Sequence, residues 1–121
     1  NGDNVLIHAI YLSMVLGYDP IYLVGADASW HEYLFLNQKS NDLSIKMNHF
    51  DKTEEVIRYI DDLKTKRANM AWTFEFLYKT FNSFHVVSDY AAYKKIKIYN
   101  CSSFSWIDSF ERKKVKKINF E

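Results

Sequence analysis

Apolar residues fall into separate blocks along the chain, and their spacing predicts which blocks are helices and which are strands. The run VLIHAIYLSMVL, residues 5–16, is apolar nearly all round, which predicts a buried helix. Asp3 or Asn4 would provide its N-cap, and Gly17 would end it. Residues 21–24 follow a proline and are apolar without alternation, which is typical of a strand that a parallel sheet buries on both faces.

The middle of the chain combines a long polar loop with two further helices. The loop covers residues 26–48, with a short strand at residues 43–47, and long loops in compact domains tend to be functional. The segment DKTEEVIRYIDDL, residues 51–63, opens with Asp, has Glu three residues later and spaces its apolar residues along one helical face, which predicts a capped helix. Another helix is predicted over residues 69–84, and VVSDYAAYKK continues or restarts it. The aromatic stripe of this helix favours a place in the core over a ligand pocket.

The last third of the chain predicts a second strand and a final helix. IKIYN, residues 96–100, has the pattern of a parallel strand, and SSFSWIDSFERKK would form a capped helix that starts near Ser105. The order helix, strand, helix, helix, strand, helix indicates the α/β class, with a Rossmann-like parallel sheet flanked by helices on both faces. Two strands make a thin sheet, so residues 1–121 are either a single α/β domain that gains strands from a partner or a segment of a larger domain.

Polar clusters follow both predicted strands. GADASWHEY comes after the first strand and NCSS after the second, and ligands of open α/β sheets bind beyond the carboxyl ends of the strands. We therefore expect a cleft at this edge, with Asp27, His31, His49 and Asn100 around one concavity.

Charge excludes one class of partner and singles out one segment. The formal net charge is +1, from 16 basic and 15 acidic residues, so the chain lacks the overall basic field that holds nucleic acid. The run ERKKVKK, residues 111–117, is the local exception. It is typical of a solvated terminus, and the alternative is contact with phosphate or with the anionic lipid of a membrane surface. Its basic residues are Arg112, Lys113, Lys114, Lys116 and Lys117.

Cysteine content and hydropathy indicate a cellular compartment. Cys101 is the one cysteine, so an internal disulfide is excluded, which fits a reducing compartment. No segment reaches the roughly 18 apolar residues of a membrane span, and no signal peptide is visible. We expect a cytoplasmic protein, with the inner face of the membrane as an alternative location.

Several segments together resemble one superfamily. LGYDPIYLVGAD resembles the LGY-x-x-IYL-x-G-x-D segment of bacterial sialyltransferases of glycosyltransferase family 42, which also occurs in motility accessory factor and hydroxymethylpterin diphosphokinase-like proteins. GADASWHE, NHFDK and KIYNCSSFSWIDSFER resemble bacterial polysaccharide-biosynthesis proteins of the same superfamily. The order and spacing of these motifs, from Asn4 to Arg112, carry the resemblance.

The resemblance implies a glycosyltransferase that binds a nucleotide-sugar donor and a glycan acceptor in a Rossmann-like cleft. The reaction would invert the sugar carbon without a metal or other cofactor and would serve synthesis of lipopolysaccharide, capsule or flagellar glycan. Residues 1–121 would then be the C-terminal segment of such an enzyme, and a homo-oligomer is one further expectation. A diphosphokinase-like enzyme, with Asp27 and Glu32 as candidate magnesium ligands, and a non-catalytic remnant of the fold are the alternatives.

Two histidines are the catalytic candidates. The resemblance places His49 where the sialyltransferases carry the general base that deprotonates the acceptor hydroxyl, and imidazole titrates near neutral pH. The alternative role of His49 is a backbone contact at a helix entry. His31 is the second candidate, as a ligand of phosphate or of a sugar hydroxyl, or as a solvated loop residue.

The substrate-binding candidates surround the predicted strand ends. Asp27 either holds a ribose or sugar hydroxyl or braces its loop, and Asn4 either contacts the donor phosphate at a helix N-terminus or caps that helix. Ser29 and Phe35 stand where the sialyltransferases have tyrosines, so Tyr33 is the nearest source of a hydroxyl, and the donor sugar need not be sialic acid. The full set is Asn4, Asp27, Ser29, Trp30, Tyr33, Asn100, Ser102 and Ser103, of which the last three either contact nucleotide or cap a helix.

Other chemistries lack their motifs. The sequence has no Gly-rich phosphate loop, HExxH, CxxC or GxSxG, which leaves P-loop, zinc and serine-hydrolase mechanisms without their residues. No Asp-x-Asp motif is present, so the sequence predicts no metal site.

Overall fold

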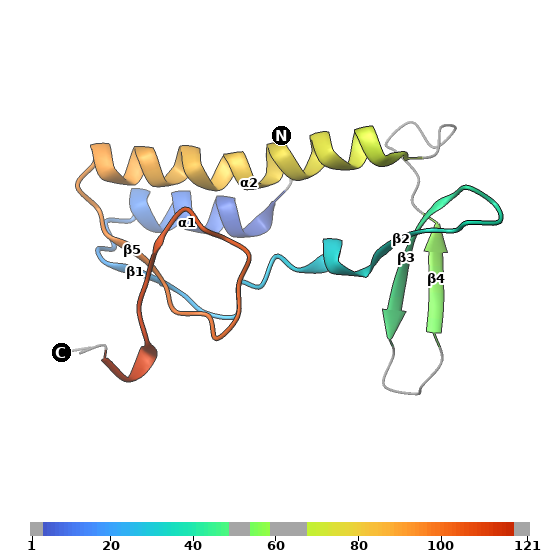
Figure 1. Cartoon of the computed structure of the whole chain (residues 1–121). Helices are drawn as coiled ribbons and strands as arrows, with labels where there is room; N and C mark the ends of the chain where they lie inside the picture. The colour runs from blue at the N-terminus through green and yellow to red at the C-terminus, as the bar shows by residue number, and fades with distance from the viewer. Residues whose placement is uncertain (1–3, 49–53, 59–67, 118–121) are drawn as a thin grey trace. The chain divides into compact units, whose positions relative to one another are not determined.

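A computed structural model of the chain describes residues 4–48, 54–58 and 68–117 (Figure 1). It divides into two compact units. The first unit joins Asn1–Ala28 to Tyr78–Glu121, so it is built from both ends of the chain, and the second is Ser29–Leu77. The long helix α2, Met70–Tyr93, belongs to both units.

The first unit contains a three-stranded sheet in the order β1-β5-β6. β1 (Ile21–Leu23) and β5 (Ile98–Asn100) are parallel neighbours, with Ile21 opposite Ile98. This confirms the expected parallel pairing. β6 (Glu111–Arg112) adds a third parallel strand beside β5, and a short 3-10 helix, Val115–Lys117, follows it.

Helix α1, Val5–Val15, has the predicted ends. The Asn4 side-chain oxygen accepts a hydrogen bond from the Leu6 N–H at 2.9 Å, which makes Asn4 the N-cap. Gly17 follows the helix with φ +87°, a conformation that glycine adopts without steric cost. Burial is narrower than expected, because one stripe of the helix faces the core, whereas Val5 and Val15 are 82% and 80% exposed. The buried stripe consists of Ile7, Ile10 and Met14.

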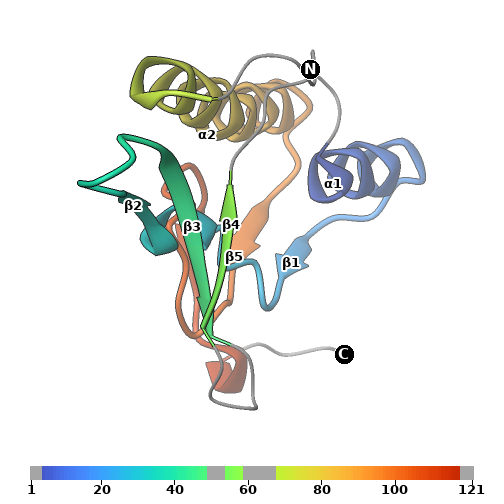
Figure 2. The ribbon, with the colours of Figure 1, turned by 90° about the vertical axis from the view of Figure 1, so that its right-hand side faces the viewer.

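The core of the first unit lies between the helices and the sheet. Figures 1 and 2 show α1 and α2 on the same side of β1 and β5. Inward side chains of the strands, including Leu23 and Ile98, pack with Phe84 of α2 in one cluster. Tyr22 and Tyr99 alternate with them and stack on each other with ring centroids 5.8 Å apart. Within the described residues, the expected cover of helices on both faces is therefore wrong.

The final helix predicted from Ser105 is also absent from the described part of the chain. Residues 101–110 form an irregular segment between β5 and β6. Ile107 and Phe110 from this segment are buried in the core cluster. Their spacing, three residues apart, suits a helix as well as this bent path, so the local pattern could not distinguish the two.

The second unit contains an antiparallel sheet in the order β2-β3-β4. A 3-10 helix, Trp30–Tyr33, leads into β2 (Leu34–Leu36), and β3 (Leu43–Asn48) confirms the short strand predicted at residues 43–47. The expected loop therefore contains regular structure.

The prediction of a helix over residues 51–63 is wrong for Glu54–Arg58, which form strand β4. The rest of that segment lies outside the described residues. β4 pairs along its whole length with β3, and its adjacent Val56 and Ile57 are β-branched residues that suit a strand. The apolar spacing of the segment fits one face of a helix equally well, and the neighbouring strand decides between the two structures.

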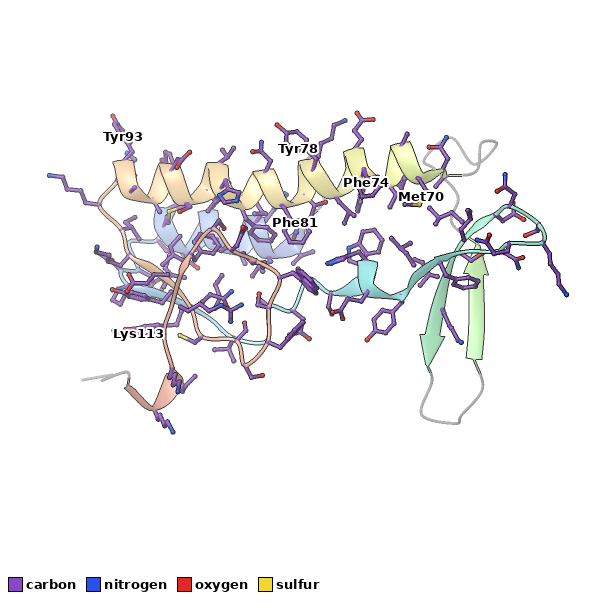
Figure 3. The ribbon with its side chains drawn as sticks, viewed as in Figure 1. Met70, Phe74, Tyr78, Phe81, Tyr93 and Lys113 are labelled. Atoms are coloured by element: carbon purple, nitrogen blue, oxygen red, sulfur yellow. The ribbon has the colours of Figure 1, made fainter. Side chains whose placement is uncertain are left out.

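Helix α2 runs without a break over 24 residues, so VVSDYAAYKK continues the preceding helix. Its aromatic stripe is only partly core: Phe84 is buried and Phe81 packs against the core cluster, but Phe74 and Tyr78 are 63% and 67% exposed (Figure 3).

Among the described residues, no helix combines the length and hydropathy that crossing a membrane requires.

Candidate functional site

The segments that follow β1 and β5 are bonded to each other at the carboxyl ends of these strands. The Cys101 N–H donates to the Leu23 carbonyl at 2.8 Å, which extends the pairing by one residue. Beyond it, the Ala26 N–H donates to Ser102 Oγ at 2.9 Å, and the Trp106 N–H donates to the Asp27 carbonyl at 2.9 Å. The two polar clusters that the sequence places after its strands therefore meet at one edge of the sheet.

Asn100 holds this edge together from within. Its side chain is 1% exposed, and its Nδ2 donates to Ser105 Oγ at 3.1 Å and to the Ile107 carbonyl at 3.3 Å. Its Oδ1 accepts the Ser102 N–H at 3.1 Å. These bonds occupy the amide group, which argues against a contact with nucleotide. The described residues have no helix directly after Asn100 for it to cap, so Asn100 instead holds the irregular segment that follows β5.

Two serines complete the network, and a third stays outside it. The buried Ser102 hydroxyl oxygen accepts the Ala26 N–H, as described above. Ser105, which the sequence analysis missed as a site residue, donates its hydroxyl to the Ala26 carbonyl and accepts the N–H of Ile107 at 3.1 Å. The sequence marks Ser105 only as the start of a predicted helix, and its contact with Ala26, 79 residues away, has no local pattern that could reveal it. Ser103 is exposed beside the network.

Asp27 and Asn4 make local contacts. Asp27 is exposed, and its backbone carbonyl accepts the Trp106 N–H, so the main chain braces its loop. Asn4 caps α1 through its side-chain oxygen. Of the two roles left open for Asn4, the geometry supports capping.

The remaining candidates lie in the second unit. Trp30 meets Phe76 of α2 edge-on with ring centroids 5.4 Å apart, and His31 adjoins Trp30 at 6.3 Å. Ser29 precedes the 3-10 helix and accepts the Glu32 N–H through its carbonyl at 3.0 Å, and Tyr33 is exposed. Since Asp27 and Asn100 belong to the first unit, the concavity expected around Asp27, His31, His49 and Asn100 stays a prediction.

His49, the candidate general base, lies outside the described residues. In the described part of the chain, no three His, Cys, Asp or Glu side chains are grouped so that they could hold a metal ion.

The basic run adjoins the strand-end network. β6 pairs Arg112 with Asn100, and the Lys113 N–H donates to the Asn100 carbonyl at 3.1 Å. Arg112 Nη2 donates to the Ser105 carbonyl at 2.7 Å, and Lys113 Nζ lies 4.5 Å from the centroid of the Tyr99 ring. The beginning of the run is therefore structured, and among its described residues 111–116 all except Lys113 are exposed, as the expectation of a solvated segment requires.

Between these segments lies a hollow of about 740 Å³, which we call the strand-end pocket. It is lined by residues 100–103 and residues 112–116. None of these lining residues carries a carboxylate, and four carry a positive charge: Arg112, Lys113, Lys114 and Lys116. The pocket therefore provides a positive electrostatic environment for an anion.

Comparison of the chain with protein-family models, with curated proteins and with solved structures found no match.

Proposed function

We propose that the chain contributes the donor side of a nucleotide-sugar-dependent glycosyltransferase that builds a bacterial surface polysaccharide or flagellar glycan. The observation that carries the proposal lies at the carboxyl ends of two neighbouring parallel strands, where the segments after them are joined by the hydrogen bond that the Ala26 N–H donates to Ser102 Oγ. This edge is where open α/β sheets bind nucleotides. The motifs shared with the sialyltransferase-like superfamily support the choice of reaction.

In the proposed reaction, His49 accepts the proton of the acceptor hydroxyl. The acceptor oxygen then forms its bond to the anomeric carbon while the bond from that carbon to the nucleotide phosphate oxygen breaks, with inversion. The nucleotide leaves with the bonding electrons as a phosphate anion, which positive charge near the strand ends would stabilise. A cytoplasmic location, with transfer at the inner face of the membrane, belongs to the same proposal.

The test combines binding and turnover. Calorimetric titration of the chain with a panel of nucleotides and sugar nucleotides measures affinity, and release of free nucleotide with and without a glycan acceptor measures transfer. His49→Ala should leave donor affinity nearly unchanged and lower turnover by about a hundredfold or more, because general-base catalysis typically contributes 10²–10⁴ in rate. His8→Ala, on the exposed side of α1, is the matched control and should leave both quantities unchanged.

Three results would contradict parts of this proposal. Binding to no nucleotide would favour a non-catalytic remnant of the fold. Magnesium-dependent turnover of ATP, without turnover of sugar nucleotides, would favour a diphosphokinase-like enzyme. Normal turnover in His49→Ala would keep the transferase and remove the base, which makes His31 the next residue to test.

A further inference from the structure

The strand-end pocket brings together two sequence features that are separate in the chain. One side is residues 100–103, the end of β5 and the segment after it, and the other side is residues 112–116 of the basic run, the end of β6 and the segment after it. The parallel pairing of β5 with β6 places both segments at the same edge of the sheet. Its volume of about 740 Å³ lies within the usual range for small-molecule sites.

The side of the pocket formed by residues 100–103 offers few free backbone donors. The Cys101 N–H already donates a hydrogen bond to the Leu23 carbonyl, and the Ser102 N–H donates one to Asn100 Oδ1. An anion in the pocket would therefore be held by the cationic side chains, with the exposed Ser103 as a further side-chain donor.

Arg112 and Lys113 are anchored by contacts with the protein, and Lys114 and Lys116 are exposed. Arg112 donates a hydrogen bond from its guanidinium group to the Ser105 carbonyl, and the half-buried Lys113 lies over the Tyr99 ring. Such anchoring lowers the entropy lost when a ligand binds. Lys114 and Lys116 are exposed and line the same pocket, so they can close on an anion inside it.

We propose that the strand-end pocket is a phosphate-binding site, in which Lys114 and Lys116, together with Arg112 and Lys113, hold a phosphate or diphosphate group. The inference takes from the proposed function only the expectation that this group belongs to a nucleotide. Its hollow between two segments, with the exposed Ser103 hydroxyl on one side and four cations on the other, distinguishes the pocket from a flat basic patch that would rest on a membrane.

The test uses pyrophosphate as the probe, measured by calorimetry at low ionic strength. Lys114→Gln combined with Lys116→Gln should weaken pyrophosphate binding by about tenfold or more, because two charge-assisted hydrogen bonds are lost. Both side chains are exposed, so the double variant should keep the far-UV spectrum and the unfolding midpoint of the parent. Arg112 is left unchanged because its guanidinium also holds the Ser105 carbonyl.

A matched double variant separates a specific site from overall charge. Lys39→Gln combined with Lys94→Gln removes the same net charge at exposed positions that do not line the pocket, and should change the affinity by less than about twofold. Backbone amide spectra give the location: pyrophosphate should shift the signals of residues 101–103 and 112–116. Equal weakening in both double variants, or unchanged signals in these two segments, would overturn the proposal.

A second arm distinguishes free phosphate from a lipid headgroup. The chain is sedimented with phosphatidylcholine vesicles that contain phosphatidylglycerol, with and without pyrophosphate. Weak vesicle binding, or binding that pyrophosphate displaces, supports the pocket. Vesicle binding that requires Lys114 and Lys116 but that pyrophosphate does not displace would overturn it in favour of a flat membrane contact. If pyrophosphate binds as described while no sugar nucleotide is turned over, the phosphate site stands and the glycosyltransferase proposal fails.

Discussion

The Ser105 side chain connects the segment after β1 with the end of β5 and with Ile107. Its hydroxyl donates to the carbonyl of Ala26 and accepts hydrogen bonds from the Asn100 amide and the Ile107 N–H. Asn100 is almost fully buried, so loss of Ser105 would leave part of its amide without a partner inside the protein. An unsatisfied buried polar group costs more than an ordinary hydrogen bond contributes.

Ser105→Ala should therefore lower the free energy of unfolding by about 2 kcal/mol. Ser103→Ala is the matched control, since this exposed neighbour should change stability by less than about 0.5 kcal/mol. Urea denaturation followed by circular dichroism measures both. Equal stability of the two variants would show that the Ser105 network does not hold the strand ends.

Asn4 gives a prediction that separates its two candidate roles. Because its side-chain oxygen accepts the Leu6 N–H, Asn4→Ala should destabilise the chain by about 1 kcal/mol, and Asn4→Asp should restore the cap. Urea denaturation measures the loss, and the nucleotide titration described above measures affinity. Unchanged stability together with weaker nucleotide binding would instead assign Asn4 to the ligand.

Among the elements, β4 shows how a neighbouring strand overrides a local pattern. Its segment carries apolar residues at helical spacing, yet Ser44 to Asn48 of β3 pair with all five residues of β4. A strand beside β3 satisfies the backbone groups of both segments, which an isolated short helix of marginal stability would not do.

Carbon chemical shifts test this element directly. Cα shifts of residues 54–58 should lie below their random-coil values, as in a strand, whereas those of residues 78–93 of α2 should lie above them in the same spectrum. Helical shifts at residues 54–58 would restore the helix that the apolar spacing predicts.

In the molecule as a whole, the first unit depends on contacts between the two ends of the chain. The buried residues of α1 and β1 pack with Phe84, Val87 and Ile98, all of which follow residue 77. β1 likewise finds its hydrogen-bonding neighbour in β5. An 11-residue helix is marginal in water without such packing, so the N-terminal elements cannot form stably by themselves.

A fragment of residues 1–77 should consequently lose the structure of α1 and β1. Its amide signals for residues 4–28 should collapse to random-coil positions, while the full chain, measured under the same conditions, keeps them dispersed. Native-like signals for α1 in the fragment would show that the N-terminal elements fold without the C-terminal half of the first unit.

The sequence by itself determined the elements whose signals lie within one stretch of chain. The cap at Asn4, the stop at Gly17, the short apolar strands and the long helix were all predictable, because capping, turn geometry and periodicity are local properties. Parallel pairing of β1 with β5 followed from their apolar pattern and from the helical segment between them. The placement of polar residues after these strands predicted the edge at which the candidate site lies.

Only the tertiary structure decided the features that depend on a partner elsewhere. β4 exists because β3 lies beside it, and the segment after Asn100 is irregular because Ser105 and Ile107 bond to other segments and to the core. The two-residue β6 has no periodicity that could reveal it, yet its pairing with β5 brings the basic run to the strand ends. The strand-end pocket could not be predicted from the order of the residues, because its two lining segments meet only through the pairing of β5 with β6, which leaves no local pattern.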